Sequence, residues 1–159
     1  MVSACSCTHL LNPAALAQNG LLRLTPRHDG TEEPVDVRIS QIQLEQDTAK
    51  STYDAYSSQA LIDLNRAGTA LIEIISEPDM HSSAEAAAYV RKVQKILRTT
   101  GASDADMEKG SLRIDVNVSV AVESGARGTR CEIKNLNSVR SMIDAIGQRD
   151  PTVITAARS

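Results

Sequence analysis

Aromatic residues are almost absent from this chain, which has three Tyr, no Phe and no Trp among 159 residues. Any core must therefore be built from Leu, Ile, Val and Ala, which bury less area per residue than aromatic side chains do. The content of 42% apolar and 23% charged residues is still that of a globular protein, and the length suffices for one ordinary domain. So thin a core in a chain of this size suggests an incomplete domain.

Cysteine and histidine are also scarce. The three thiols, Cys5, Cys7 and Cys131, are too few and too unevenly spaced for a disulfide framework. The three His residues show no ligand-like spacing. The sequence therefore predicts neither a disulfide scaffold nor a four-ligand structural zinc site.

Basic charge is not in excess, since 17 Lys and Arg stand against 20 Asp and Glu and give a formal charge of -3. Proteins that hold nucleic acid unaided usually carry a basic excess, so contact with RNA would need help from other surfaces. Residues 1–22 contain no Lys or Arg, and so they lack the basic region of a secretory signal and the Arg-rich pattern of an organellar presequence. No apolar run suggests a membrane span.

Alternating apolar and polar residues predict a first pair of strands. The alternation runs through residues 21–25 and 35–44 on either side of a polar turn at 26–34, the pattern of a hairpin with a long loop. The alternation changes phase near Ser40, where a β-bulge is expected. The segment 51–60, rich in Ser, Tyr and Gln, is expected to be flexible.

The clearest helical pattern follows Pro78, which ends the preceding strand. Ser82 with Glu85 three residues later forms a capping box, and Gly101 is a typical helix end. Apolar residues between them form one stripe, and most basic residues lie off it, where they are expected to face solvent or, alternatively, to contact phosphate. The stripe consists of Ala86, Val90, Val93 and Leu97, and the basic residues are Arg91, Lys92, Lys95 and Arg98.

Residues 112–120 alternate strictly, with apolar side chains at even positions and polar ones at odd positions. One face of this strand belongs to the core, and the other carries a polar row. Such a row commonly faces water, but Asp and Asn are poor strand formers, so two of them in mid-strand favour a functional reason. The row consists of Arg113, Asp115, Asn117 and Ser119.

A partner strand is predicted at 129–134 after a Gly-containing turn, followed by a short helix at 139–146 with Asn137 or Ser138 as N-cap. Together the segments make two antiparallel hairpins, one further strand and two helices. The predicted fold class is therefore α+β, an antiparallel sheet with flanking helices.

A carboxylate in the middle of an apolar strand is the least expected feature of the sequence. Glu73 lies within the run 71–75, LIEII, which is typical of a buried strand. A buried charge is costly unless a cation, a donor network or a metal compensates it, so Glu73 is a candidate functional residue. A second polar cluster with Glu45 and Gln46 closes the strand at 42–50, and by itself such a cluster is typical of a solvated strand end.

Four sequence blocks lie in a fixed order along the chain. They are IQLEQDTAK (42–50), IDLNRAGTALIEIISEPDM (62–80), MEKGSLRIDVNVSV (107–120) and TRCEIKNLNSVR (129–140). In order and spacing they resemble the B subunits of the aspartyl/glutamyl-tRNA amidotransferases, the GatB family. The resemblance covers roughly residues 35–148 and depends on several blocks in register rather than on one short motif.

The resemblance implies a carbon–nitrogen ligase that uses ATP and Mg²⁺ and takes its amide nitrogen from glutamine. In this family, the B subunit phosphorylates the side chain of Glu misacylated on tRNA(Gln), and ammonia displaces the phosphate in support of translation. The implied partners are an amidase (the A subunit), a small third subunit of the C or F type, and the misacylated Glu-tRNA(Gln); no membrane insertion is implied. The implied fold is part of a cradle domain similar to the catalytic domains of glutamine synthetase and guanidino kinases.

The resemblance also implies roles for particular residues. Glu73 matches a metal-ligating Glu of the family, and Gln46 stands where a second Glu is usual after Glu45. The expected metal ligands are Glu73, Glu45 and Gln46. The expected catalytic residues are Glu73, Glu45, Asp115, Asn117 and Lys134, and the expected ATP-binding residues are Arg113, Ser119, Asn135 and Arg66.

The chain departs from the family pattern at both ends, because the opening strand IGLEVHxQL, whose Glu and His complete the metal site, has no counterpart. We expect residues 1–12 to be an unmatched segment, 13–149 part of a catalytic (cradle) domain and 150–159 an unmatched tail, without the helical and tRNA-binding tail domains. By itself the chain is expected to be inactive. Three interpretations stay open: a family member truncated or mispredicted at both ends, a non-catalytic remnant that binds only a partner or nucleotide, and an unrelated metal-binding α+β domain.

Localisation is implied by resemblance alone. The form LEQDTAK, in place of LEEDAGK, resembles mitochondrial members of the family and implies the mitochondrial matrix. Bacterial cytoplasm and chloroplast stay open, as do the third subunit's identity and the choice between tRNA(Asn) and tRNA(Gln).

Overall fold

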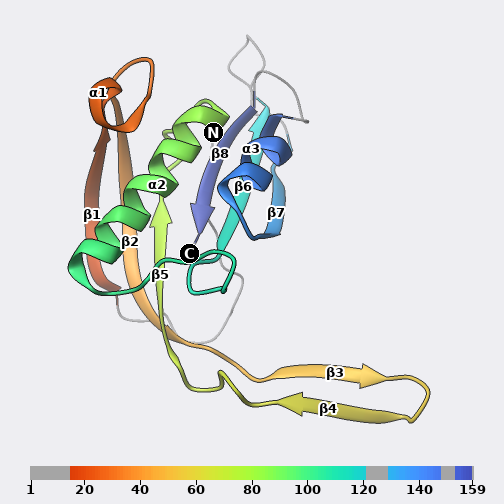
Figure 1. Ribbon diagram of the computed structural model, residues 1–159. Coiled ribbons are helices and arrows are strands. Elements are labelled where there is room, and N and C mark those ends of the chain that lie inside the picture. The colour runs from red at the N-terminus through yellow and green to blue at the C-terminus, as the bar shows by residue number, and fades with distance from the viewer. Residues whose placement is uncertain (1–14, 121–128, 148–152, 159) are drawn as a thin grey trace.

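The computed structural model describes residues 15–120, 129–147 and 153–158, and within them the chain forms three antiparallel sheets and three helices (Figure 1). The α+β class is confirmed. In chain order the elements are β1 (Ala15–Leu24), α1 (Pro26–Asp29), β2 (Val35–Gln46), β3 (Lys50–Asp54), β4 (Gln59–Asp63), β5 (Ala70–Ser76), α2 (Ser83–Thr100), β6 (Ile114–Val120), β7 (Cys131–Leu136), α3 (Val139–Gly147) and β8 (Val153–Arg158).

The first sheet has the strand order β1-β2-β5. Its β1–β2 pair is the predicted first hairpin, with longer strands than the alternation indicated and with the short helix α1 in the loop. A register shift between Ile39 and Gln41 on β2 confirms the bulge expected near Ser40. β5, which carries Glu73, pairs with the other side of β2 and forms one edge of this sheet.

The second sheet has the order β7-β6-β8, with β6 in the centre. The antiparallel pairing of β6 with β7 confirms the second predicted hairpin. Strand β8 was not predicted, because the run VITAAR shows no clear alternation of apolar and polar residues. Three features of the sequence lie outside the described residues. They are the predicted turn before β7, the thiols Cys5 and Cys7, and the unmatched N-terminal segment.

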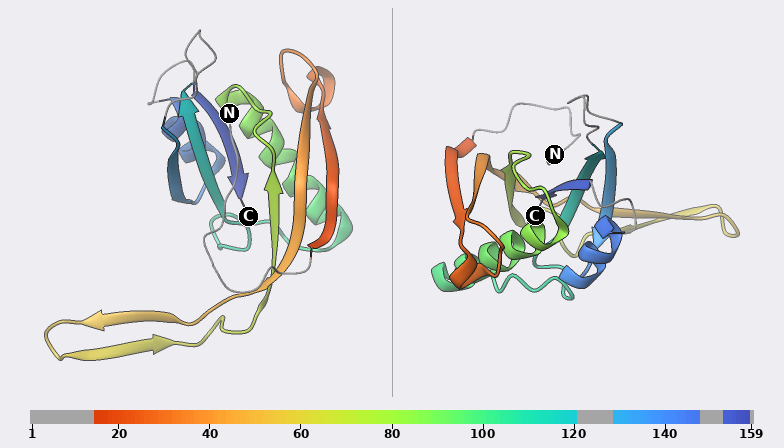
Figure 2. Two further views of the ribbon diagram at one scale, coloured as in Figure 1. Left: turned by 180° about the vertical axis from the view of Figure 1, so that it is seen from behind. Right: turned by 90° about the horizontal axis from the view of Figure 1, so that it is seen from above.

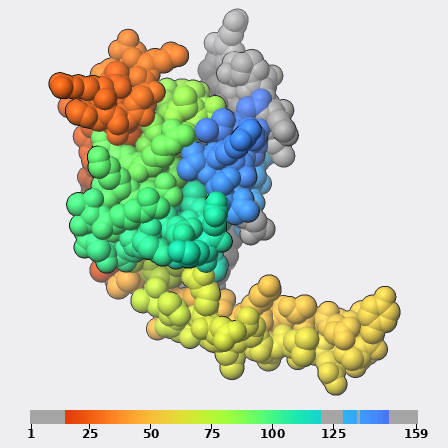
Figure 3. Space-filling model, viewed as in Figure 1, coloured from red at the N-terminus to blue at the C-terminus, as the bar shows by residue number. Residues whose placement is uncertain are grey.

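The segment 51–60, expected to be flexible, forms most of a hairpin that the sequence analysis did not predict. Residues 51–54 belong to β3 and residues 59–60 to β4, which pair antiparallel from Lys50↔Asp63 to Asp54↔Gln59. The usual Gly signal of a hairpin turn is missing, because a non-glycine residue, Ser58, takes the left-handed conformation there with φ 52°. The β3–β4 hairpin projects away from the rest of the chain (Figures 1 and 3).

Helix α2 has the predicted ends. The Ser82 hydroxyl accepts a hydrogen bond from the Glu85 amide, and Gly101 ends the helix in the left-handed conformation with φ 73°. Helix α3 begins as predicted, since the Ser138 hydroxyl accepts from the Ser141 amide at 3.0 Å. No helix in the described ranges is both long and apolar enough to cross a membrane.

Helices α2 and α3 cover the same side of the two main sheets (Figure 2). The predicted stripe of α2 faces this core: Ala86, Val90 and Val93 are buried, and Leu97 packs against them. The described core consists mainly of Leu, Ile, Val and Ala, as the composition predicted, but it also contains Tyr89 and three Met residues that were not predicted.

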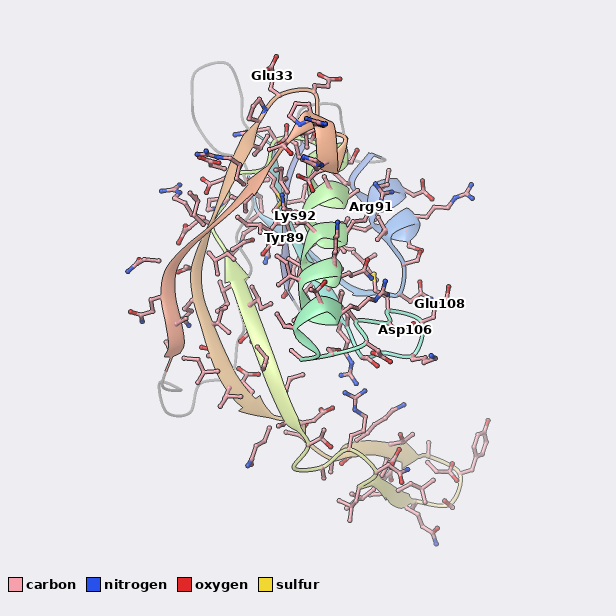
Figure 4. The ribbon with its side chains drawn as sticks, turned by 60° about the vertical axis from the view of Figure 1, so that its left-hand side comes forward. Glu33, Tyr89, Arg91, Lys92, Asp106 and Glu108 are labelled. Carbon is pink, nitrogen blue, oxygen red and sulfur yellow. The ribbon has the colours of Figure 1, made fainter. Side chains whose placement is uncertain are left out.

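Of the four basic residues of α2, Lys92 alone is not exposed. Lys92 forms an ion pair with Asp29 of α1 at 2.8 Å, and the exposed Arg98 side chain donates to the carbonyl of Asp104 at 2.7 Å. Burial raises the pKa of Asp29, but hydrogen bonds from Lys92 and Thr25 outweigh that effect and hold the pKa below its usual range. Arg91 and Lys95 are exposed, and Figure 4 shows Tyr89 on the sheet side of α2 and Arg91 on the other.

The polar row of β6 does not simply face water. Asn117 and Ser119 are buried, with 2% and 7% of their surface exposed, whereas Arg113 is exposed. Ile114, Val116 and Val118 on the other face of the strand are also buried. Both faces of β6 are therefore covered along this part of the strand, whereas strict alternation commonly indicates one solvated face.

We expect Ser82→Ala to destabilise the chain by about 1 kcal/mol, because one amide at the start of α2 loses its acceptor. The free energy of unfolding in urea measures this loss. The matched control is Ser83→Ala, one residue inside the helix, which should change stability little. Equal effects of the two substitutions would contradict the capping role.

We expect Tyr89 to limit stability at high pH. Burial raises the pKa of its hydroxyl to about 12. Because an unfolded Tyr titrates near pH 10, the folded state binds the proton more tightly. Stability should therefore be intact below about pH 10 and should fall between about pH 10 and 12 by about 1.4 kcal/mol per pH unit.

Tyr89→Phe should remove this component, so that its stability declines less steeply than that of the original chain over the same range. The control is Tyr53→Phe, since Tyr53 is 67% exposed. Urea midpoints at several pH values measure the slopes, and identical slopes for the original chain and Tyr89→Phe would disprove the assignment.

Candidate functional site

The carboxylate of Glu73 is buried, as predicted, with 1% of the residue exposed. It lies directly across from Gln43 in the β2–β5 pairing, and the Gln43 Nε2 donates a hydrogen bond of 2.5 Å to the Glu73 Oε2. Side chains alternate along β5, so Glu73 faces the side of the sheet opposite to Ser76, which is next to Tyr89 of α2. The charge is therefore directed away from the helix-covered core.

A row of polar side chains on β2 fixes the orientation of the Gln43 amide. Gln41 Nε2 donates to Gln43 Oε1 at 2.7 Å, so the Gln43 nitrogen is turned towards the carboxylates. The same nitrogen donates to Glu45 Oε1 at 3.0 Å as well as to Glu73. Glu45 and Glu73 thus converge on one amide nitrogen from neighbouring strands.

A pocket of about 520 Å³ lies beside β5 and is bounded by the loop after α2 and by the start of β6. This volume is in the range of small-molecule sites. Six of the residues that the sequence predicted for the site line it. They are Glu45 of β2, Glu73 of β5, Arg66 of the turn before β5, Arg113 and Asp115 at the start of β6, and Lys134 of β7.

Asp47 forms ion pairs with Arg66 and Arg113, the two arginines that line this pocket. Its Oδ2 is 2.9 Å from Arg66 Nε and 3.7 Å from Arg113 Nη2. The backbone of Asp47 is fixed as well, because its amide donates to Thr69 O and its carbonyl accepts from Gly68 N. Arg66 also donates to the carbonyl of Gly110, which ties it to the opposite loop.

The loop after α2 is ordered by its own hydrogen bonds. The Asp106 Oδ1 accepts from the amides of Glu108 and Lys109 at 3.0 and 3.1 Å, and the Asp106 carbonyl accepts from Ser111 N at 2.9 Å. Hydrogen bonds from Lys109 hold the pKa of Asp106 below its usual range. Figure 4 shows Asp106 and Glu108 on this loop, whose later residues Gly110 and Ser111 line the pocket.

Residues 8–152 match the GatB/GatE catalytic domain. The chain belongs to this family. The B subunit of the mitochondrial glutamyl-tRNA(Gln) amidotransferase of Cryptococcus neoformans is 51% identical over 139 residues, which are 87% of this chain and 26% of that protein.

Two further relatives are also named as amidotransferase B subunits. The B subunit of the mitochondrial glutamyl-tRNA(Gln) amidotransferase of Laccaria bicolor is 62% identical over 112 residues, 70% of this chain and 21% of that protein. The B subunit of the aspartyl/glutamyl-tRNA(Asn/Gln) amidotransferase of a Wolbachia strain is 59% identical over 112 residues, 70% of this chain and 23% of that protein. The chain therefore spans about a quarter of the length of the curated relatives that it matches.

Three predicted site residues of this GatB-family chain, all within the described ranges, do not line the pocket, and a fourth is not described there. Gln46 is exposed at the end of β2, and Asn117 and Ser119 are buried further along β6. Within the described ranges, the Asn117 Nδ2 has no hydrogen-bond partner. Asn135 lies in β7, but its side chain is outside the described part of the chain.

The two converging carboxylates fit part of a Mg²⁺ site. Mg²⁺ is commonly held by one or two protein carboxylates together with water and substrate phosphates, and Glu45 and Glu73 could supply those carboxylates. Within the described ranges, no three His, Cys, Asp or Glu residues are grouped closely enough to hold a metal ion by themselves. The donor set of the described residues therefore suits an ion that is shared with a phosphate ligand.

Sequence reasoning missed Gln43 and Asp47, the two residues that orient the site. Gln43 contacts both carboxylates and Asp47 contacts both arginines. The alternation of Gln41, Gln43 and Glu45 was a usable signal, because three polar residues at a spacing of two share one face of a strand. Neither partner of Asp47 is close to it in sequence, so no local pattern could indicate its role.

We expect Gln43→Leu to destabilise the chain by about 1–3 kcal/mol, because it removes a donor from a buried carboxylate. The double variant Gln43→Leu/Glu73→Leu should recover most of this loss, since both polar partners are then replaced by apolar groups. Unfolding in urea provides the double-mutant cycle. Gln46→Leu, which changes an exposed glutamine of the same strand, is the matched control, and an equal loss in that variant would argue against the bridging role of Gln43.

Proposed function

We propose that this chain is the central part of the catalytic domain of an amidotransferase B subunit, which phosphorylates and then amidates the side chain of Glu attached to tRNA(Gln). The proposal is supported by family membership and by one feature of the pocket. Glu45 and Glu73, whose carboxylates converge on the Gln43 amide, line the same pocket as three cations, Arg66, Arg113 and Lys134. Phosphoryl transfer needs both kinds of group, carboxylates for a metal ion and cations for phosphate oxygens.

Each side chain has a role that follows from its chemistry. Glu73 and Glu45 would ligate Mg²⁺, with Gln43 keeping both carboxylates in place. Arg66 and Arg113 present planar guanidinium groups suited to phosphate, and the shared contact with Asp47 limits their motion. ATP would supply the phosphoryl group, and Mg²⁺ would neutralise the charge on the phosphate oxygens. Lys134 and Asp115 at the same pocket would position the substrate carboxylate and the ammonia that replaces its phosphate.

The remaining predicted residues have weaker support. Asn117 has a buried amide nitrogen without a partner in the described ranges, so it remains a candidate for contact with the nucleotide or substrate. Ser119 and Asn135 remain predictions based on resemblance. We do not extend the metal proposal to Gln46, because it is exposed and does not line the pocket.

The whole assembly belongs to the proposal as well. We infer an amidase that supplies ammonia from glutamine, a small third subunit, and a cradle architecture like that of glutamine synthetase, with residues 13–149 as the catalytic part. Two of the relatives are named mitochondrial, which supports the mitochondrial matrix, while the Wolbachia relative is bacterial.

The test is amidation of misacylated tRNA by a full-length B subunit whose catalytic domain carries this chain, together with the amidase, the third subunit, ATP and Mg²⁺. The product Gln-tRNA(Gln) is the expected result, and ammonium chloride in place of glutamine should bypass the amidase. If ATP binds but no Gln-tRNA forms, the chain is a non-catalytic binding module and the proposed activity is wrong.

We expect Glu73→Gln to lower the rate of amidation by roughly 100-fold or more, because metal coordination supplies several kcal/mol of charge stabilisation. The substitution preserves side-chain size, and the glutaminase activity of the amidase should remain. The matched control is Glu33→Gln, a change of an exposed Glu near α1, which should leave the rate unaltered. Full amidation activity in Glu73→Gln would remove Glu73 from the metal site.

A further inference from the structure

The β3–β4 hairpin exposes apolar side chains that contribute nothing to the core. All residues of β4 and all but one of β3 are exposed, and both strands extend from the main sheets into solvent (Figures 1 and 3). Large apolar side chains are concentrated on and beside it. They are Tyr53 (67% exposed), Tyr56 (103%), Leu61 (59%), Ile62 (63%) and Leu64 (66%).

The apolar side chains lie on both faces of the hairpin. The pairing of Ser51 with Ile62 and of Tyr53 with Ala60 places Tyr53 and Ile62 on one face. Leu61, opposite Thr52, lies on the other face. A two-stranded hairpin is marginally stable by itself, and a contiguous exposed apolar patch commonly marks a site of interaction.

The charges of the hairpin favour a protein over RNA as its partner. Between Lys50 and Asp63 there is one basic residue and there are two acidic ones, and Lys50 is paired across the strands with Asp63. The carboxylate of Asp54 accepts hydrogen bonds from the Ser57 hydroxyl and the Tyr56 amide at 2.7 and 3.0 Å. A surface that binds an RNA backbone needs several cations for its phosphates, and this hairpin has one Lys and two Asp residues.

The apolar side chains lie on both faces of the hairpin. This arrangement favours a different protein, rather than a second copy of this chain, as the binding partner. A two-fold contact between copies would join one face of the hairpin to the same face of its partner and leave the other face in water. A groove on another protein can enclose both faces at once. Tyr residues such as Tyr53 and Tyr56 are also enriched in protein interfaces.

We propose that the β3–β4 hairpin is a docking arm that inserts into an apolar, weakly charged groove of another protein of the amidotransferase, the amidase that supplies ammonia. The identity of this partner rests on the proposed function and on the naming of the relatives as B subunits. The arm is continuous with the pocket, because β3 follows the strand that carries Glu45 and β4 precedes the strand that carries Glu73. An amidase bound to the arm would therefore lie beside the pocket.

The test measures binding of the full chain to the purified amidase by calorimetry, without tRNA, ATP or Mg²⁺. We expect Tyr53→Ser/Ile62→Ser to weaken binding at least tenfold, and Leu61→Ser, on the opposite face, to weaken it severalfold. The matched control is Leu21→Ser on β1, which removes an apolar side chain that is 58% exposed, and it should bind like the original chain. Thermal unfolding should be unchanged in all three variants, since none of these side chains is buried.

Equal binding by the hairpin variants and the original chain would overturn the proposal, as would the absence of binding by the original chain. A hairpin variant that loses affinity for tRNA but not for the amidase would overturn it in favour of RNA, and a dimer of the chain that the variants dissociate would overturn it in favour of a second copy. Since binding is measured without amidation, the proposal can hold even if the proposed activity fails. The amidation assay with Glu73→Gln tests that activity separately.

Discussion

The hydrogen bond between Gln43 and Glu73 is the interaction on which the site depends. It joins β2 to β5 at a buried position, and it exists because of the bulge between Ile39 and Gln41. Without the bulge, Ile42 instead of Gln43 would lie across from Glu73, and the polar row of β2 would point to the other side of the sheet. A register change of one residue reverses every side chain of a strand, so this local irregularity decides whether the carboxylate is buried among donors or among apolar groups.

The pocket is built from parts that are far apart in the sequence. Two of its carboxylates come from β2 and β5 and a third, Asp115, from β6, whereas its cations come from the turn before β5, from the residue before β6 and from β7. Asp47 connects these parts, since it follows Glu45 on the chain and forms ion pairs with Arg66 and Arg113. Carboxylates and cations within one pocket are chemically suited to a nucleotide with its metal ion.

The distribution of the few aromatic residues distinguishes the core from the hairpin. Tyr89 is buried between α2 and the first sheet, whereas Tyr53 and Tyr56 are exposed on the β3–β4 hairpin. A chain with so little aromatic surface places two of its three Tyr residues where they cannot stabilise the isolated fold. Burial in the core does not explain these exposed side chains, whereas the proposed docking of the hairpin to another protein would.

Much of the local structure follows from the sequence alone. The Ser82–Glu85 capping box, the end of α2 at Gly101, the bulge at Ser40 and the burial of Glu73 are all encoded within a few neighbouring residues, where periodicity and capping act. The order of the four blocks was sufficient for the resemblance to the GatB family. The hairpin at 51–60 was missed because Ser58 takes a conformation that normally indicates Gly.

Only the tertiary structure decided which polar residues meet. Local sequence could not show that Gln43 bridges Glu45 and Glu73, that Asp47 holds both arginines, or that Asn117 is buried instead of facing solvent. The physical reason is that these contacts depend on strand register and on the approach of two separate sheets. Sequence patterns determine which side of a strand is polar, whereas the partner on that side is determined by how distant segments pack.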